Sequence, residues 1–577
     1  MAMYLTPDNS IRQTQSRDLV EIHLPDGRTF EGPRSLPVGI FLRALPEWDN
    51  PPIVGAVIND ELRELTYPID IESRVRPVTM AEADGARIYR RSITFLLEAA
   101  FEELFPNDDL IVDHSVASGG FFCWLDGRAP LTTAELARLE NRMREIVAAD
   151  LPLERHTVPL EEAIAYFQSK GYDDKVRLLK YRQRKELVLY RLLHHQDYHH
   201  GYMVPSTGFL RWFTLTLLGT GFVLQYPRRN APTELLPMPE YPKLLNTFRQ
   251  YEQWLTRLGI ASVGALNDSI VAGRAREIIL VAEALHEQQI SDIAQQIVER
   301  VNQARIVLIA GPSSSGKTTF SKRLAVQLLS QGLSPFPLEM DNYFVDRDRT
   351  PRDEDGRIDF EALEALDTTR LQSDLQHLLA GEKVQLPHYN FHTGMSEPGE
   401  WVQLAPDQLV ILEGIHGLNP RLLPDIPSAQ TFRIYVSCLT QLNLDRYNRI
   451  STTDTRLIRR IVRDARERGY TAKDTIGRWD MVRRGEKRHI FPYQEYADAM
   501  FNSAQVVELS VLRPLAEPLL RQVPFGHPEY IEAKRLLSFL QWFQPIEADL
   551  IPGNSILQEF LGGSSLKAFK LWEHNNG

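Results

Sequence analysis

The sequence has few cysteines and no long apolar run. Its two cysteines, Cys123 and Cys438, lie far apart, which excludes a disulfide framework and a zinc site built from cysteines. The N-terminal stretch MAMYLTPDNSIRQTQSRD has no apolar segment of the kind found in secretory signals. The most apolar run, residues 212–226, is short and is interrupted by glycine and threonine, which favours buried strands over a membrane span. We therefore expect a cytoplasmic protein without a membrane segment.

Basic residues are also fewer than acidic residues. The chain has 65 Lys and Arg against 76 Asp and Glu, a net charge of −11, which argues against nucleic-acid binding over the whole surface. A local basic face stays open as an alternative. The 577 residues are too many for one hydrophobic core, so we expect several domains.

Changes of pattern along the chain predict five segments. LVEIHLPDGRTFEG alternates like a strand and turns at Asp26-Gly27, which predicts a hairpin. ITFLLEAAFEELF and TAELARLENRMREIVA have helical spacing, and YPRRNAPTELLPMPEYPK is proline-rich like a linker. The predicted segments are a small mixed domain (1–85), an α+β domain (86–225), a linker with helices (226–300), an α/β domain (301–522) and a helical extension (523–577).

A phosphate-binding strand, loop and helix is predicted from Arg305 onward. Gly311, Gly316, Lys317 and Thr318 complete the pattern G-x-x-x-x-G-K-S/T, with the apolar RIVLIA before it and the helical TTFSKRLAVQLLSQG after it. Backbone N–H groups of the loop and the helix start would hold phosphate oxygens of ATP, Lys317 would reach the β- and γ-phosphates, and Thr318 would bind Mg²⁺. A chance glycine–serine loop is the alternative. The predicted ATP contacts are Gly311, Pro312, Ser313, Ser314, Ser315, Gly316, Lys317, Thr318 and Thr319.

Two acids follow apolar runs that read as further strands. Asp341 comes after PFPLEM and Glu413 closes QLVIL. Ligands of open α/β sheets bind at the carboxyl ends of strands, so Asp341 is placed to meet an acceptor hydroxyl and Glu413 to bind the metal. The alternatives are a helix cap or turn for Asp341 and a surface strand end for Glu413.

Arginines recur at helical spacing in TDTRLIRRIVRDARERG. Arg456, Arg459, Arg460 and Arg463 would share one helix face, where guanidinium groups can neutralise phosphate charge. We predict that Arg456 takes part in catalysis and that Arg460 and Arg463 contact ATP. A solvated basic helix is the alternative.

Residues 305–510 resemble the uridine kinase/phosphoribulokinase family of P-loop kinases. The motifs GPSSSGKTT, DNYF, IDFEALEALD, LPHYNFHTG, VILEGIHGL and TDTRLIRRIVRDARERG follow in the family's order. The resemblance implies a parallel sheet with helices on both faces, ATP and Mg²⁺ as cofactors, Asp341 as the base toward a nucleoside 5′-hydroxyl, and Glu413 near Mg²⁺. It places Glu361 at the ribose, Tyr389 and Phe391 along the base pocket, and Arg456 on the lid helix. The predicted substrate contacts are Asp341, Tyr343, Glu361, Tyr389, Phe391, His392 and Arg456.

One position departs from the pyrimidine-specific members of that family. They have a histidine three residues after the phenylalanine of the tyrosine-x-phenylalanine stretch, where this chain has Gly394, and the nearest histidine is His392. Loss of a hydrogen-bonding group from a base pocket changes discrimination strongly. The nucleoside therefore stays open.

The N-terminal part resembles modules of threonyl-tRNA synthetase. VEIHLPDGRTFEG and VGAVINDELRELTYPI make residues 18–80 similar to a β-grasp-like TGS domain, and FEELFP and HHGYMVP make residues 86–205 similar to the synthetase's editing domain. The two polar pairs of that domain fall on Phe95 and Ala99 and on His199 and Met203. Three of these four residues cannot bind metal or activate water, so we predict that editing chemistry is absent.

Two polar stretches near residue 190 allow more than one interpretation. HHQDYHHG (194–201) could bind metal, but no matching second cluster is found, and histidines are common at wet turns. KVRLLKYRQRKELVLYRLL (175–193) reads as a helix with many cations, which is either a solvated face or an RNA contact.

The chain as a whole resembles fused bacterial nucleoside kinases with this three-part layout. We expect an ATP-dependent nucleoside 5′-kinase, with no membrane partner and with homo-oligomer formation left open. The alternatives are a sugar-phosphate kinase of the phosphoribulokinase type and an RNA- or tRNA-binding regulator whose contact is gated by nucleotide. A deacylase is disfavoured by Phe95, Ala99 and Met203.

Overall fold

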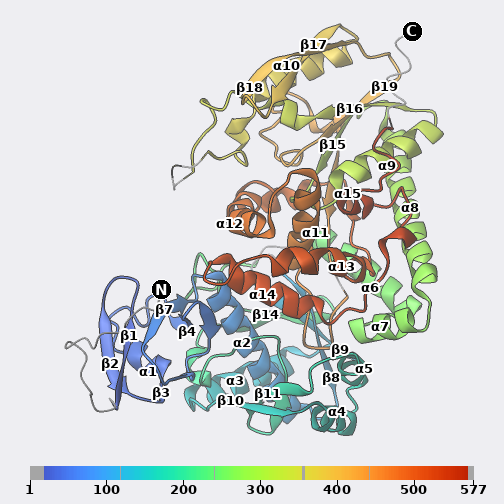
Figure 1. The fold of residues 1–577 in the computed structure, drawn as a ribbon. Helices are drawn as coiled ribbons and strands as arrows, with labels where there is room; N and C mark the ends of the chain where they lie inside the picture. Colours follow the sequence, from blue (N-terminus) through green and yellow to red (C-terminus); the bar gives the residue numbers. More distant parts are fainter. Residues whose placement is uncertain are drawn as a thin grey trace, which may run out of the picture. The chain divides into compact units, whose positions relative to one another are not determined.

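The computed structural model describes residues 18–116, 119–238, 241–353, 356, 358–440 and 442–569. These residues form two compact units, each built from three stretches of chain (Figure 1). The first unit contains residues 18–110, 119–158 and 187–237, and the second contains residues 111–116, 159–186 and 238–569. Among the described residues, no helix has the length and apolar character needed to span a membrane.

The first unit begins with a five-stranded sheet in the order β2-β1-β7-β4-β5. Strands β1 (Leu19–His23) and β2 (Thr29–Pro33) pair antiparallel, as the turn at Asp26-Gly27 predicts, and β1 pairs parallel with β7 (Ser73–Thr79). The sheet packs against helix α1 (Val38–Leu42). The remaining strands are β3 (Leu36–Pro37), β4 (Ile53–Ile58), β5 (Glu61–Arg63) and β6 (Pro68–Ile69).

Helix α2 (Ala83–Leu104) forms the centre of the rest of the first unit, and its buried face includes Phe95 and Glu98. Helix α3 (Thr133–Ala148) begins at a capping box made by Thr132 and Glu135. The apolar run at 212–226 forms two paired strands, β13 (Thr214–Leu218) and β14 (Gly221–Gln225), and β14 pairs with β9 (Gly120–Asp126). A second sheet has the order β10 (Glu154–Pro159), β11 (Glu186–Leu192) and β12 (His195–Asp197).

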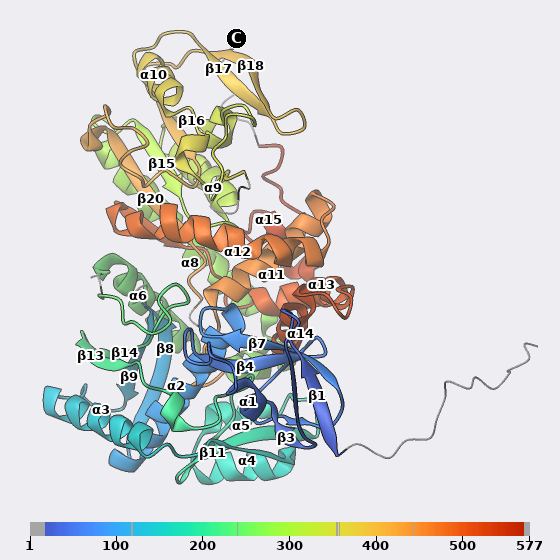
Figure 2. The same ribbon diagram turned by 90° about the vertical axis from the view of Figure 1, so that its left-hand side faces the viewer.

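The second unit is organised around a parallel sheet in the order β16-β19-β15-β20-β21 (Figure 2). Its strands are β15 (Ile306–Ala310), β16 (Ser334–Glu339), β19 (Gln408–Glu413), β20 (Thr431–Ser437) and β21 (Ala499–Asn502). Alternate residues of β15 enter different cores. Ile306 and Leu308 pack with helix α10 (Thr368–Leu379), whereas Val307 and Ile309 pack with α8 (Ala275–Arg300) and α9 (Lys317–Ser330). Helices therefore cover both faces of the sheet, as predicted.

Further elements of the second unit surround this sheet. A hairpin of β17 (Val384–Asn390) and β18 (Met395–Val402) adds to the α10 side. The chain after β20 is mainly helical, with α11 (Thr452–Glu467), α12 (Ala472–His489), α13 (Glu508–Arg521), α14 (Glu529–Leu540) and α15 (Gln558–Leu561). The second unit also contains four helices that precede β15, namely α4 (Leu160–Ser169), α5 (Asp173–Leu179), α6 (Pro242–Leu258) and α7 (Val263–Val271).

The prediction of one continuous helix over residues 175–193 is wrong. The segment is split into the end of α5, a turn and strand β11. The strand has the period-two burial of ELVLYRL, with Leu187 and Leu189 inside. Its cations therefore do not share one helix face.

Candidate active site

The loop between β15 and α9 has the close backbone approaches that require glycine. A side chain at Gly311 would place its Cβ 1.9 Å from the carbonyl oxygen of Val436, and one at Gly316 would lie 2.5 Å from Ile556. Gly316 also has a φ of +85°, which glycine adopts without strain. The loop turns tightly into the start of α9, so its N–H groups can point at an anion.

The carboxyl ends of three neighbouring strands bring four predicted residues to one place. Lys317 and Thr318 open α9 after β15, Asp341 follows β16 in a short 3-10 turn (Met340–Tyr343), and Glu413 ends β19. The Thr318 hydroxyl donates to Glu413 Oε1 over 3.4 Å. Lys317 interacts electrostatically with both Asp341 and Glu413. The parallel order of the strands explains why residues so far apart in sequence meet here.

Both acids have raised pKa values. Burial raises the pKa of Glu413 to about 7, against the opposing effect of Lys317. The side chain of Asp341 reaches solvent, but surrounding atoms remove part of its hydration and raise its pKa, which Lys317 again opposes. Among the described residues, no hydrogen bond holds the Asp341 carboxylate, and the cap of its 3-10 turn is Glu339, so Asp341 does not cap that turn. Its carboxylate can therefore accept a hydroxyl proton.

Thr318 and Glu413 fit a magnesium ion. A hydroxyl and a carboxylate oxygen are the hard ligands that Mg²⁺ prefers, and the two oxygens lie 3.4 Å apart. Two protein ligands are also enough where phosphates and water complete the coordination.

Two carboxylates bind the N–H groups of the loop. Ser313 N–H donates to Glu486 Oε1 over 3.1 Å, and Thr319 N–H donates to Glu559 Oε2 over 3.1 Å. Burial would raise the pKa of Glu486, but Arg456 holds it below its usual value, so this carboxylate is anionic. The loop is thus an anion-binding site that this conformation fills with the chain's own acids.

Three arginines of α11, Arg456, Arg459 and Arg460, contact the loop and do not form a solvated face. Arg456 and Arg459 are fully buried and form ion pairs with Glu486 and Glu508. They also donate to loop carbonyls, Arg456 to Ser313 over 3.0 Å and Arg459 to Ser314 over 3.4 Å.

The next two arginines differ in their contacts with the loop. Arg460 donates to Ser313 Oγ over 2.7 Å, whereas Arg463 binds Asp464 over 2.9 Å. Arg460 is therefore placed to meet an anion in the loop, and the structure shows no such contact for Arg463.

The predicted substrate residues occupy different environments. Tyr389 is buried in the core that also contains Phe344, and Tyr343 is buried and donates to Asp374 over 3.1 Å. Phe391 is 56% exposed and packs its ring edge against Tyr389, with ring centroids 5.0 Å apart. Phe391 thus offers an accessible aromatic surface, and the buried Tyr389 ring packs against it.

Two further predicted substrate residues, Glu361 and His392, are polar. Glu361 has a pKa raised to about 7 by burial and by Glu486. His392 lies in the exposed turn of the β17–β18 hairpin. Their roles stay predictions.

Sequence reasoning missed Glu486 and Glu559. Glu486 lies in a stretch rich in lysine and arginine, and Glu559 lies in the C-terminal helical part. They are 173 and 240 residues away from their partners in the loop, so no local pattern connects them.

A parallel sheet covered on both faces, with a Walker-type loop after its central strand and acids at the ends of adjacent strands, defines a P-loop kinase domain. Residues 306–510 match the model of the Phosphoribulokinase / Uridine kinase family. A solved structure described as a possible uridine kinase from Bacillus stearothermophilus is 24% identical, covers 25% of this chain and 79% of its own, and gives a TM-score of 0.21.

The N-terminal part is similar to threonine–tRNA ligases. The ligase of Acidovorax sp. (strain JS42) is 33% identical over 207 residues, which cover 34% of this chain and 31% of the ligase. The ligase of Polaromonas sp. (strain JS666) is 30% identical over 241 residues, 42% of this chain and 37% of the ligase. The chain therefore spans about a third of the length of these relatives.

Proposed function

We propose that the chain is an ATP- and Mg²⁺-dependent kinase that transfers the γ-phosphoryl group to the 5′-hydroxyl of a nucleoside. The observation that carries this proposal is the meeting of Lys317, Thr318, Asp341 and Glu413 at the carboxyl ends of β15, β16 and β19. A cation, a metal-binding pair and a carboxylate facing the same cation are the parts that phosphoryl transfer needs.

Each residue has a role set by its chemistry. Lys317 and the loop N–H groups would hold the phosphates, and Thr318 and Glu413 would hold Mg²⁺, which when bound neutralises charge on the phosphate oxygens. Asp341 would orient the acceptor hydroxyl and take its proton late in the transfer. Because Glu486 and Glu559 use loop N–H groups that phosphates would use, nucleotide binding requires them to release these bonds.

The base pocket differs from that of the pyrimidine-specific members. Gly394 has a φ of +75°, and a Cβ there would lie 2.8 Å from the Arg347 guanidinium. Arg347 also donates to the carbonyl of Phe391 over 2.6 Å. A histidine at residue 394 would be strained and would clash with Arg347, which occupies the space beside Phe391. We therefore propose that the preferred base differs from uracil.

A substrate panel with the purified full chain tests this function. ADP release is measured with purine nucleosides, pyrimidine nucleosides and phosphorylated sugars in the presence of Mg²⁺. We expect turnover with at least one nucleoside and none in Lys317→Ala, because the ammonium group that holds the phosphates is gone. Lys383→Ala, at an exposed lysine over Trp401, should keep normal turnover. Turnover only with a sugar phosphate would favour the phosphoribulokinase-type alternative.

A further inference from the structure

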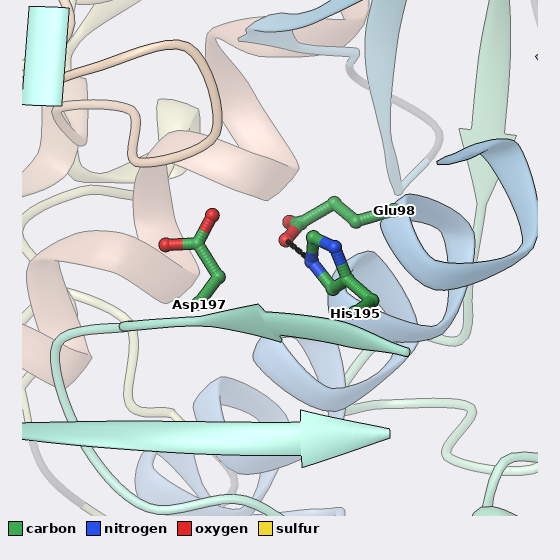
Figure 3. Close-up of side chains that lie close together, drawn as sticks. All are labelled: Glu98, His195 and Asp197. Carbon is green, nitrogen blue, oxygen red and sulfur yellow. Dashed lines mark hydrogen bonds and ion pairs between the residues drawn. The ribbon is translucent and has the colours of Figure 1, made fainter. Parts of the chain in front are cut away.

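A buried polar cluster lies in the first unit, apart from the phosphate loop. Glu98 comes from α2, and His195 and Asp197 come from β12 (Figure 3). The three residues are at most 2% exposed, and one potential ligand atom from each lies within 4.8 Å of the others. An imidazole nitrogen and two carboxylates inside a protein form a donor set for a divalent cation.

An outer carboxylate orients the histidine. His195 Nδ1 is hydrogen-bonded to Glu102, one turn after Glu98 on α2, so its other nitrogen, Nε2, faces Glu98 Oε2 at 3.2 Å. Metal-binding histidines usually have their second nitrogen fixed in this way by a carboxylate. The Tyr198 N–H also holds Asp197, by donating to Oδ1 over 2.6 Å.

A second histidine reaches the same carboxylate. His199 Nε2 is hydrogen-bonded to Glu98 Oε2 at 3.3 Å, the oxygen that also faces His195, and lies 3.2 Å from Glu98 Oε1. Two ligands of one tetrahedral zinc ion, each about 2.1 Å from it, are roughly 3.4 Å apart, close to these spacings. The Phe95 ring covers the cluster, with its centroid 5.1 Å from that of His195 and 5.8 Å from that of His199.

We propose that Glu98, His195 and Asp197 bind one structural zinc ion. Imidazole ligands favour Zn²⁺ over Mg²⁺ or Ca²⁺, and a cluster buried from solvent favours a structural ion over a catalytic one. The ion would link α2 to β12, which are 97 residues apart at the His195–Glu98 contact. Phe95 and Ala99, the residues at the first polar pair of the editing resemblance, take no part, because the site uses Glu98 between them.

Zinc binding to the full chain tests the proposal. Protein as purified is analysed for metal by mass spectrometry, then stripped with a chelator and titrated with Zn²⁺ against a chromophoric competitor. We expect one ion per chain and a rise in Tm when Zn²⁺ is added. Less than one tenth of an equivalent, both as purified and after titration, would overturn the proposal and identify the cluster as a hydrogen-bonded network.

Matched variants assign the ligands. Glu98→Gln with His195→Asn should lower zinc affinity at least 100-fold. Glu102→Gln, which alters the residue hydrogen-bonded to His195 Nδ1, should lower it roughly 10- to 100-fold. His156→Gln, at the exposed His156–Glu154 pair of the same unit, should bind zinc like the wild type. Because the double variant can fail to fold, circular dichroism accompanies it, and Asp197→Asn serves as a milder ligand change. Unchanged affinity in folded Glu102→Gln and Asp197→Asn would overturn the assignment.

Discussion

Asp341 is the one acid near Lys317 whose removal should separate chemistry from binding. Asp341→Asn keeps the size of the side chain but removes the proton acceptor, so kcat should fall at least 100-fold while the Kd for ATP changes little. Steady-state ADP release and ATP titration measure the two quantities. Lys383→Ala, at the exposed lysine over Trp401, is the control outside the proposed chemistry. A near-normal kcat in Asp341→Asn would remove Asp341 from the role of base.

Glu413 should make the stability of the chain depend on pH in a defined window. Burial raises its pKa from 4.5 to about 7, with Asp341 and Glu559 adding to the effect and Lys317 opposing it. The folded protein therefore keeps this proton where the unfolded chain has lost it, and the carboxyl's contribution to stability is lost as pH rises from about 4.5 through about 7.

The comparison of wild type with Glu413→Gln isolates this effect. In EDTA the two proteins should have nearly the same Tm at pH 4.5, whereas the variant should be the more stable at pH 8. Mg²⁺ should raise the Tm of the wild type at pH 8 more than that of the variant. A Tm difference that is the same at both pH values would contradict the buried, raised-pKa carboxyl.

Functional residues can be predicted from the sequence when a local motif identifies them. The phosphate loop is one uninterrupted motif, and Asp341 and Glu413 follow apolar strands directly. Glu486 and Glu559 could not be predicted, because a lone glutamate on a helix looks the same whether it is solvated or bound to a backbone N–H group far away in sequence. The cluster of Glu98, His195 and Asp197 could not be predicted for the same reason, because Glu98 lies on α2 and the other two residues lie on β12.

The C-terminal helix α15 is the element that should compete with nucleotide. Its Glu559 accepts from Thr319 N–H at the start of α9, and the neighbouring Ile556 packs against Gly316. A hydrogen bond to a charged group contributes about 1.5–3 kcal/mol, and a neutral amide accepts more weakly. Glu559→Gln should therefore bind ATP more tightly, by about fivefold.

Calorimetric titration with ATP and Mg²⁺ measures this change. Glu467→Gln, an exposed acid on α11, is the control and should leave the Kd unaltered. Weaker ATP binding in Glu559→Gln would show that the glutamate holds the loop in shape for nucleotide, the opposite of competition.

Helices and strands with a regular pattern of apolar residues could be predicted from the sequence, and those whose pattern is interrupted by charged residues could not. The apolar runs before Gly311 and Gly414 form strands as expected, because parallel strands buried on both faces leave no polar positions. Residues 175–193 were misassigned because their many cations obscured the period-two burial of β11. Lys175 shows the difficulty most clearly, since a lysine normally marks the surface and this one is fully buried.

The whole second unit depends on chain that lies far upstream of the family match. Residues 159–186 belong to this unit although the match begins at residue 306. Helix α5 supplies Lys175, whose Nζ lies 3.0 Å from Asp445 Oδ1, and both side chains are inaccessible to solvent. Such interleaving of distant segments has no signature in the sequence, which suggested domains in simple succession.

Breaking that pair should destabilise the kinase unit. Lys175→Met preserves most of the packing but removes the ammonium group 3.0 Å from the buried Asp445 carboxylate, a change that costs about 3–5 kcal/mol. Asp445 would still accept from the Tyr447 and Asn448 N–H groups, so the local fold should persist at low temperature while denaturant unfolding shifts strongly. Lys170→Met, at the exposed C-cap residue of α4 in the same segment, is the matched control and should change the free energy of unfolding by less than about 0.5 kcal/mol. If Lys175→Met unfolds like this control, the buried Lys175–Asp445 pair does not stabilise the second unit.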